Sequence, residues 1–452
     1  MKYLYFFWSI PTIEFLIFPQ NLGSIISIII PTIYVFYSIL KKRFEILINS
    51  MPFYLLLSNL GPSIFGAIFT EYMSIICLVI FVLYLANLKD YKVNYIQIPI
   101  AGMIIFFVLS YIVSLEYENL YKGFINGICL FGIYGLTRVT IKNYNGVVTF
   151  FESFLIAVFF ATIIILFSYF SKINLNNIDR ILNENIYSQT LAQGTFFYTA
   201  ILYLTAISII ISINLMIISD NNLKKIFILI MMLTIIFGTS VYWNKTALVA
   251  LFIVGVIAIL NNLFKRHLKM KNILLIISTF ILIFLLIFLF YIQELNSVRQ
   301  FSLSSFFARL LTYQSAFNTL FENIFIIFFG LGPESTFRLD SEILVKAKTH
   351  IFSTEGAIDS GYISYLYEYG IFFITMFIIY ILSLIILLFS KKNKNLKAKI
   401  NLDTFSYTLG LICICIMIIA LTQVLGMGKI SAIIFQIFAC AEIIINEKKY
   451  RL

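Results

Sequence analysis

Charge is what this sequence most lacks, since only 12% of its 452 residues are Asp, Glu, Lys or Arg while 61% are hydrophobic. Soluble domains carry about 25% charged residues, so this composition excludes an ordinary soluble protein. The apolar residues gather in runs of about 20, long enough for membrane-spanning helices, and do not alternate with polar residues as barrel strands would. The sequence therefore predicts an all-α integral membrane protein.

Cysteine and histidine are also scarce, with five cysteines and two histidines in the whole chain. Every cysteine lies inside an apolar run, which indicates packing residues and not disulfides. Cys413 and Cys415 have neither the spacing of a zinc site nor a nearby histidine, so no metal site is predicted. The five positions are Cys77, Cys129, Cys413, Cys415 and Cys440.

Nucleotide-handling motifs are missing as well. The chain has no Walker motif, no His-Glu-Xaa-Xaa-His, no Gly-Xaa-Ser-Xaa-Gly and no paired acids of the kind that hold a metal-bound nucleotide sugar. The sequence therefore predicts neither an ATP donor nor a nucleotide-sugar donor, and it predicts no cofactor. The net charge of +11 comes from short basic loops between apolar runs, which indicates membrane topology and contact with anionic lipids, with no nucleic-acid partner.

The apolar runs predict one polytopic helical bundle over residues 1–452, with about fourteen candidate spans by the length criterion. The first, third and ninth runs are short or marked by Pro or Gly, so we expect about 12–14 transmembrane helices. The runs are 4–18, 21–40, 50–67, 70–88, 97–115, 121–137, 147–171, 193–219, 224–241, 245–264, 272–292, 360–389, 403–423 and 427–446.

The positive-inside rule predicts that both termini are cytoplasmic. With the N-terminus inside, nearly every basic cluster, from Lys41-Lys42-Arg43 to the C-terminal Lys448-Lys449-Tyr450-Arg451, falls on the cytoplasmic side. Two segments are then external: residues 172–192, and one long non-cytoplasmic loop over 293–359. Residues 311–329 within that loop space their apolar groups as a helix does, which predicts an interfacial helix that ends at Gly330.

Three cations lie on the external face, where topology does not require them: Arg180, Lys245 and Arg309. Arg offers paired donors to phosphate oxygens and Lys a point charge, so together they could hold a diphosphate. The alternative is that each reaches lipid headgroups or pairs with a neighbouring acid, as Asp179 beside Arg180 would allow.

Two acid–base candidates end the long loop. Asp359 directly precedes an apolar helix, where it could cap the helix or serve as a general base. His350 is the one histidine predicted to be external, and it is either a second candidate base or incidental.

Aromatic and glycine residues surround these candidates. Tyr362, Tyr365 and Tyr369 share one helix face, as an aromatic belt or a sugar-stacking surface would. The segment Gly330-Leu331-Gly332-Pro333 predicts a turn, with an anion-binding backbone nest as the alternative.

In their order along residues 235–390, these residues resemble the bacterial O-antigen polymerase and O-antigen ligase superfamily. The matching positions are Lys245 after Thr239-Ser240, Arg309 before Tyr313 and Ala316, Gly330-Leu331-Gly332, and Asp359 with Tyr362 and Tyr369-Gly370-Ile371. The sequence departs from the family by having Lys245 where Arg is common. It also has Asp359 where the ligases usually carry His, which favours polymerase over ligase.

This resemblance implies a glycosyltransferase of the C-type membrane class in the bacterial plasma (inner) membrane. The donor would be an undecaprenyl-diphosphate-linked oligosaccharide, and the product a surface polysaccharide such as O-antigen or capsule. Lys245, Arg309 and Arg180 would hold the diphosphate, Arg309 would also act in catalysis, and Asp359 or His350 would be the base. Tyr313, Gly330, Gly332, Tyr362 and Tyr365 would contact substrate. No metal is implied, and whether a polysaccharide chain-length regulator binds stays open.

Three rival functions remain on the sequence: an O-antigen ligase, a lipid-linked oligosaccharide flippase, and another polyprenyl-sugar transferase. His350 keeps the ligase hypothesis open. A flippase would need charged groups inside the membrane and usually shows paired halves. Glu14 is the clearest such charge here and no halves are visible, so the sequence favours the polymerase.

Overall fold

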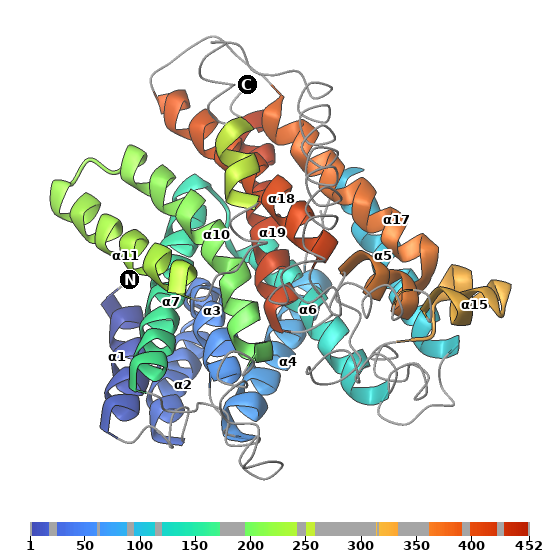
Figure 1. Ribbon diagram of the computed structural model, residues 1–452, viewed down its shortest axis with the longest axis horizontal. Helices are drawn as coiled ribbons and strands as arrows, with labels where there is room; N and C mark the ends of the chain where they lie inside the picture. The colour runs from blue at the N-terminus through green and yellow to red at the C-terminus, as the bar shows by residue number, and fades with distance from the viewer. Residues whose placement is uncertain are drawn as a thin grey trace, which may run out of the picture.

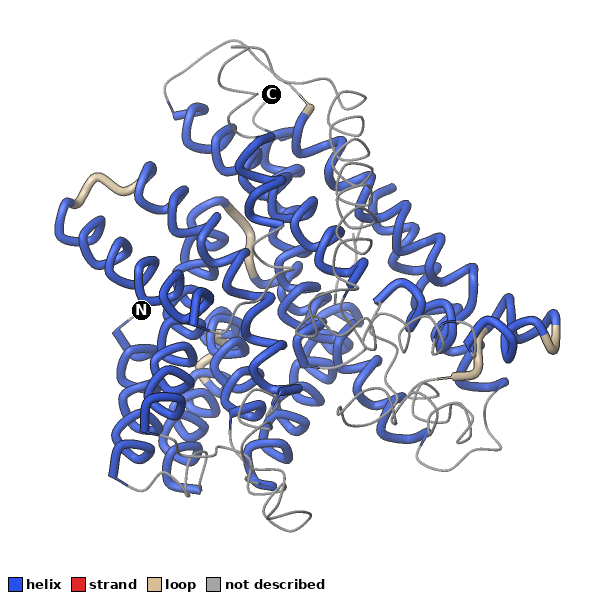
Figure 2. Tube along the Cα trace, viewed as in Figure 1, coloured by secondary structure: helices blue, strands red, loops and turns tan. Residues whose placement is uncertain are grey.

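The computed structural model describes residues 2–17, 25–60, 64–87, 95–113, 120–171, 195–241, 250–257, 313, 316–332, 361–390, 398–422 and 429–450. Nearly all of these residues are helical, and none of them lies in a strand (Figure 2). The predicted all-α class is thus confirmed for the described part of the chain.

The helices follow one another with short connections where both neighbours are described. They are α1 (Lys2–Ile17), α2 (Ile25–Leu40), α3 (Phe44–Leu60), α4 (Ile64–Asn87), the 3-10 turn η2 (Tyr95–Gln97), α5 (Ile98–Val113), α6 (Leu120–Thr140), α7 (Tyr144–Ser171), α10 (Thr195–Ile218), α11 (Asn222–Val241), α15 (Ile324–Phe329), α17 (Gly361–Phe389), α18 (Ala398–Thr422) and α19 (Lys429–Tyr450).

Four stretches among the described residues are long and apolar enough to cross a membrane: Tyr95–Ile112, Tyr144–Phe167, Gly361–Phe389 and Leu402–Ala420. Shorter apolar helices, such as Phe44–Leu57 and Leu204–Ile218, accompany them. An integral membrane protein is therefore supported. The total of 12–14 spans remains a prediction, because residues 258–312 lie outside the described part.

Burial separates the inner helices from the outer ones. In the spans of α7 and α18, 78% of residues are buried, against 39% in those of α5 and α17, so α7 and α18 are central and the other two present more surface. Figure 1 shows α5 beside α17 at one edge, with α15 projecting beyond them, while α1, α2 and α11 occupy the opposite edge. All five cysteines are buried with free thiols, as expected of packing residues.

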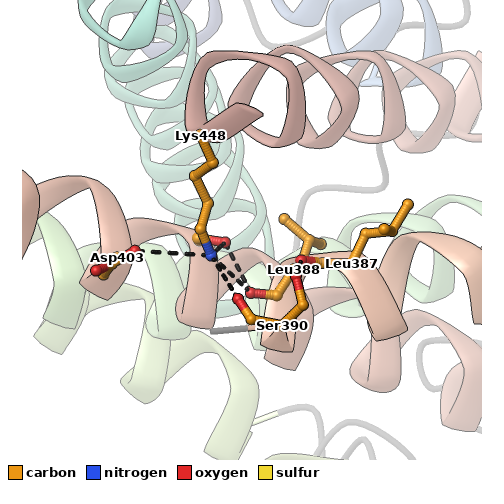
Figure 3. Close-up of polar contacts among 6 residues, drawn as sticks. Leu387, Leu388, Ser390, Asp403 and Lys448 are labelled. Carbon is orange, nitrogen blue, oxygen red and sulfur yellow. Dashed lines mark hydrogen bonds and ion pairs between the residues drawn. The ribbon is translucent and has the colours of Figure 1, made fainter. Parts of the chain in front are cut away.

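One end of the bundle is held by Lys448, beyond the apolar part of α19. Its Nζ donates to the carbonyl oxygens of Leu388 (3.3 Å) and Ser390 (3.2 Å) at the end of α17 and to Ser406 Oγ (3.1 Å) on α18, and it lies 3.7 Å from Asp403 Oδ1 (Figure 3). Burial lowers the pKa of the Lys448 ammonium, and the charge of Asp403 opposes that shift. A single cation thus joins three helix ends.

The connection between α6 and α7 reaches the same end of the bundle, since the backbone N–H of Tyr144 donates to Glu447 Oε2 on α19. Arg138 lies in the last turn of α6 and Lys142 lies within this connection, so two of the basic segments from the topology argument lie close together. Their common location agrees with the prediction that the basic loops lie on one side of the membrane. That this end faces the cytoplasm remains a prediction.

Candidate functional site

The charged residues expected to act on substrate lie outside the described part of the chain. Arg180, Lys245, Arg309, His350 and Asp359 belong to this group, and their predicted roles stay predictions. The described part does include Tyr313, residues 316–332 and all of α17, so the aromatic and glycine half of the predicted site can be examined.

Helix α17 is broken near the start of its span. Gly370 has φ 77° and ψ 178°, which divides α17 into a first half-helix, residues 361–369, and a second half-helix, residues 371–389. In an α-helix, each carbonyl group accepts from the N–H group four residues later, and the break removes these donors for the last residues of the first half-helix. The chain at Gly330–Gly332 supplies some of the missing donors.

The backbone of Leu331 and Gly332 pairs with the end of the first half-helix. Leu331 N donates to the carbonyl of Tyr367 (2.9 Å), and Gly332 N donates to the carbonyl of Glu368 (2.9 Å). The buried hydroxyl of Ser110 on α5 also donates to the Glu368 carbonyl (2.6 Å). Irregular backbone is tolerated at membrane depth only when protein satisfies it, and these bonds meet that requirement.

Two glycines allow this close crossing. A Cβ on Gly330 would collide with the Glu368 carbonyl, and a Cβ on Gly370 would collide with the Phe328 carbonyl. Both residues also have positive φ, 73° and 77°, which L side chains rarely adopt. The Gly-Xaa-Gly and Tyr-Gly elements, read from sequence as separate motifs, therefore form one structural unit.

The same bonds bear on the predicted anion-binding nest. Gly330 N donates to the Ile326 carbonyl (2.7 Å), while Leu331 and Gly332 donate to α17. The three N–H groups are thus already bound to protein carbonyls, and the geometry favours the turn over the nest. Gly330 and Gly332 hold the broken helix, and their contact with substrate remains a prediction.

The predicted interfacial helix over 311–329 is interrupted. Residues 316–321 form one helical segment and α15 forms a second, which begins after Asn323. The Asn323 side chain accepts from Phe325 N (2.9 Å), so it caps α15. Phe321 is 71% exposed and Phe325 is 62% exposed, which fits contact with lipid, and α15 ends at Gly330 as predicted.

The three tyrosines that share a face of the first half-helix point into the protein. Tyr365 and Tyr369 are each 1% exposed and pack against Phe373, with ring centroids 5.5 and 4.8 Å apart. Tyr362 is part-buried, and its hydroxyl donates to the Met417 carbonyl of α18 (3.2 Å). Core packing of Tyr365 and Tyr369 speaks against an aromatic belt, because buried rings do not reach lipid headgroups. Contact of Tyr362 and Tyr365 with substrate remains a prediction.

Tyr313 also has a packing role. It is part-buried and packs against a small cluster formed by Ala316, Leu320 and Tyr367. This cluster joins the chain before α15 to the first half-helix. The position of Tyr313 beside the broken helix agrees with its place in the predicted site, while its contact with substrate remains a prediction.

Sequence reasoning missed two buried carboxylates in α17 and α19. Glu368 is 5% exposed and lies two residues before the break, and Glu442 is 1% exposed. A single Glu inside an apolar run was the available signal, because ionisable residues at membrane depth are costly and retained for a reason.

Glu442 has a clear structural set of partners. Its Oε1 accepts from the hydroxyls of Tyr134 (2.5 Å) and Tyr380 (2.8 Å), and its Oε2 accepts from Arg138 Nε (3.2 Å). This carboxylate therefore ties α6, α17 and α19 together. Such an arrangement compensates a buried charge, so Glu442 is assigned to the fold.

The broken helix, the crossing at Gly330–Gly332 and the buried Glu368 are thus the described part of the candidate site. Neither a family model nor a curated protein sequence matches this chain.

Proposed function

We propose that this protein polymerises undecaprenyl-diphosphate-linked oligosaccharide repeat units into a surface polysaccharide on the external face of the bacterial plasma membrane. The observation that carries the proposal is the pairing of Leu331 and Gly332 with the end of the half-helix at Tyr369-Gly370. Both elements belong to the resemblance to the polymerase family, whose most specific part is the order from Gly330-Leu331-Gly332 to Asp359 and Tyr362. Their direct contact supports treating them as parts of one site.

The proposed reaction joins two lipid-linked glycans. A hydroxyl of the acceptor repeat unit attacks the anomeric carbon of the donor glycan, and the bond from that carbon to the polyprenyl diphosphate breaks with inversion. Asp359 or His350 takes the proton from the acceptor hydroxyl. Lys245, Arg309 and Arg180 stabilise the negative charge on the departing diphosphate.

The broken helix suits such a substrate. A break within an apolar helix brings polar backbone and side chains to membrane depth while neighbouring protein satisfies them. Asp359 precedes Gly361, the first residue of this half-helix, by two positions in sequence. A lipid-linked diphosphate has its reacting bond at the border between acyl chains and water. The first half-helix of α17 follows directly on the predicted external loop, so the proposed site would lie at this border.

A flippase for lipid-linked oligosaccharides is the second candidate, because discontinuous helices also mark the substrate sites of transporters. The break at Gly370 is the specific observation in its favour. A flippase moves its substrate intact across the membrane, whereas a polymerase releases polyprenyl diphosphate.

Purified protein in liposomes separates the two. With a lipid-linked repeat unit as substrate, the proposal predicts glycans of two or more units and release of polyprenyl diphosphate. Movement of the repeat unit between leaflets with no released diphosphate would overturn the polymerase and support the flippase.

A further inference from the structure

The first half-helix of α17 uses its surface in three different ways. Tyr362, Tyr365 and Tyr369 form one face, which packs on the core and bonds to α18. Ile363, Leu366 and Tyr367 form a second face, which packs against the cluster of Ala316 and Leu320. The remaining face carries two polar side chains, Ser364 and Glu368.

Ser364 and Glu368 lie four residues apart and so occupy the same face of the helix. Both are buried, with 1% and 5% of their surface exposed. Helical serines elsewhere in the bundle bond to the carbonyl four residues earlier, as Ser208 does to Leu204 (2.7 Å). Among the residues that the structure describes, the hydroxyl of Ser364 has no hydrogen-bond partner.

A buried hydroxyl without a partner costs stability, so its presence calls for an explanation such as a ligand. Glu368 makes an interaction of its own within the protein, but a carboxylate has about four acceptor positions and can accept from a ligand as well. The pair thus offers one group that accepts and one that both donates and accepts.

We propose that Ser364 and Glu368 bind hydroxyl groups of a sugar in the lipid-linked glycan, an inference that rests on the proposed function. Neighbouring sugar hydroxyls also donate and accept, so they complement this pair. A carboxyl group beside a hydroxyl matches the donors and acceptors of a sugar, and the proposed function leaves the diphosphate to the external cations. The site lies within two turns of the break at Gly370, beside the crossing that defines the candidate site.

Ser364→Ala gives the sharpest test, with Ser208→Ala as a matched control. Both substitutions remove one buried hydroxyl, but within the described part of the chain only that of Ser208 has a hydrogen-bond partner. In the liposome assay, Ser364→Ala should lower the rate of polymer formation at limiting substrate by about threefold to tenfold, the worth of one hydrogen bond. Its KM should rise, its thermal midpoint should equal or exceed that of wild type, and Ser208→Ala should keep the wild-type rate.

A wild-type rate and KM in Ser364→Ala would overturn the inference, as would a fall in its thermal midpoint, because the hydroxyl would then serve the fold. Glu368→Gln provides the second variant and should raise KM for the glycan by about threefold to tenfold, since an NH2 donor replaces one acceptor oxygen. An unchanged KM would contradict the sugar site. If wild-type protein itself forms no polymer, the proposed function fails; if it does and both variants match it, only this inference fails.

Discussion

The chain around Gly330 crosses the chain around Gly370, and each glycine lies where the backbone of the other segment comes closest. The position that a Cβ would take on Gly330 is occupied by the Glu368 carbonyl. The position that a Cβ would take on Gly370 is occupied by the Phe328 carbonyl. Both glycines have nearly the same backbone conformation, with φ 73° and 77°. The broken helix therefore depends on two residues that are 40 positions apart in the sequence.

Replacing Gly370 should damage the fold and the activity together. Gly370→Ala places a Cβ against the Phe328 carbonyl at a backbone conformation that is strained for alanine. We expect the free energy of unfolding to fall by about 1–3 kcal/mol from backbone strain, and further because of the collision. Thermal unfolding in detergent measures the effect. Gly330→Ala should behave alike.

Gly255→Ala is the matched control for this prediction, because a Cβ there meets nothing within 4 Å. In a helix that change should be neutral or stabilising by up to about 1 kcal/mol. Equal thermal midpoints for Gly370→Ala and Gly255→Ala would show that the crossing is not tight.

Removing the buried carboxylate of Glu442 should be strongly destabilising. Glu442→Ala leaves Arg138 and two tyrosine hydroxyls without their acceptor, and breaking one side of a buried pair costs about 3–5 kcal/mol. Tyr380→Phe removes one donor only and should cost about 1 kcal/mol. Equilibrium unfolding in mixed micelles would compare them, and similar losses for both variants would refute a central role for the carboxylate.

Lys448 should stabilise the helix ends through its bonds to oxygen atoms more than through its ion pair. Asp403 is half-exposed, so Asp403→Asn should cost less than about 1 kcal/mol. Lys448→Met loses the donors to Leu388, Ser390 and Ser406 and should cost about 1–3 kcal/mol. The same unfolding measurement applies, and a larger effect of Asp403→Asn would reverse this ranking.

The basic end of the bundle should face the cytoplasm. A reporter that fluoresces only in the cytoplasm should be active when fused after Leu452, and a reporter that is active only outside should be inactive there. The opposite result would invert the topology, and it would move residues 293–359 to the cytoplasmic face, where the proposed reaction does not occur.

The helical class, the end of α15 at Gly330 and the packing role of the cysteines could be predicted from sequence, because each depends on local pattern. The break in α17 could not. Residues 360–389 form one predominantly apolar run, and the backbone donors that satisfy the break come from residues 331 and 332, which the sequence places in a separate loop. The prediction of one continuous interfacial helix does not take account of Asn323. Asn is a preferred N-cap residue, so the sequence does carry a signal for a new helix after residue 323.

The tyrosines and the buried acids show the same limit. The spacing of Tyr362, Tyr365 and Tyr369 correctly indicated one face, but only the fold shows that this face is turned inward. Glu442 was overlooked because its partners Tyr134 and Arg138 lie about 300 residues away and no local pattern connects them. Long-range pairs of this kind are set by packing, which a single sequence does not display.

The central claim is polymerisation, and a strain that lacks the gene tests it most directly. Surface glycan would be resolved on a gel after complementation with wild type, Arg309→Ala, Lys245→Ala, Asp359→Ala or Gly255→Ala. We predict a ladder with wild type and Gly255→Ala, and a single repeat unit on the final acceptor with the empty strain and the other three variants, at matched membrane levels. Loss of that single-unit product in the empty strain would contradict a polymerase, pointing to a ligase if lipid-linked polymer accumulates outside and to a flippase if lipid-linked single units accumulate inside.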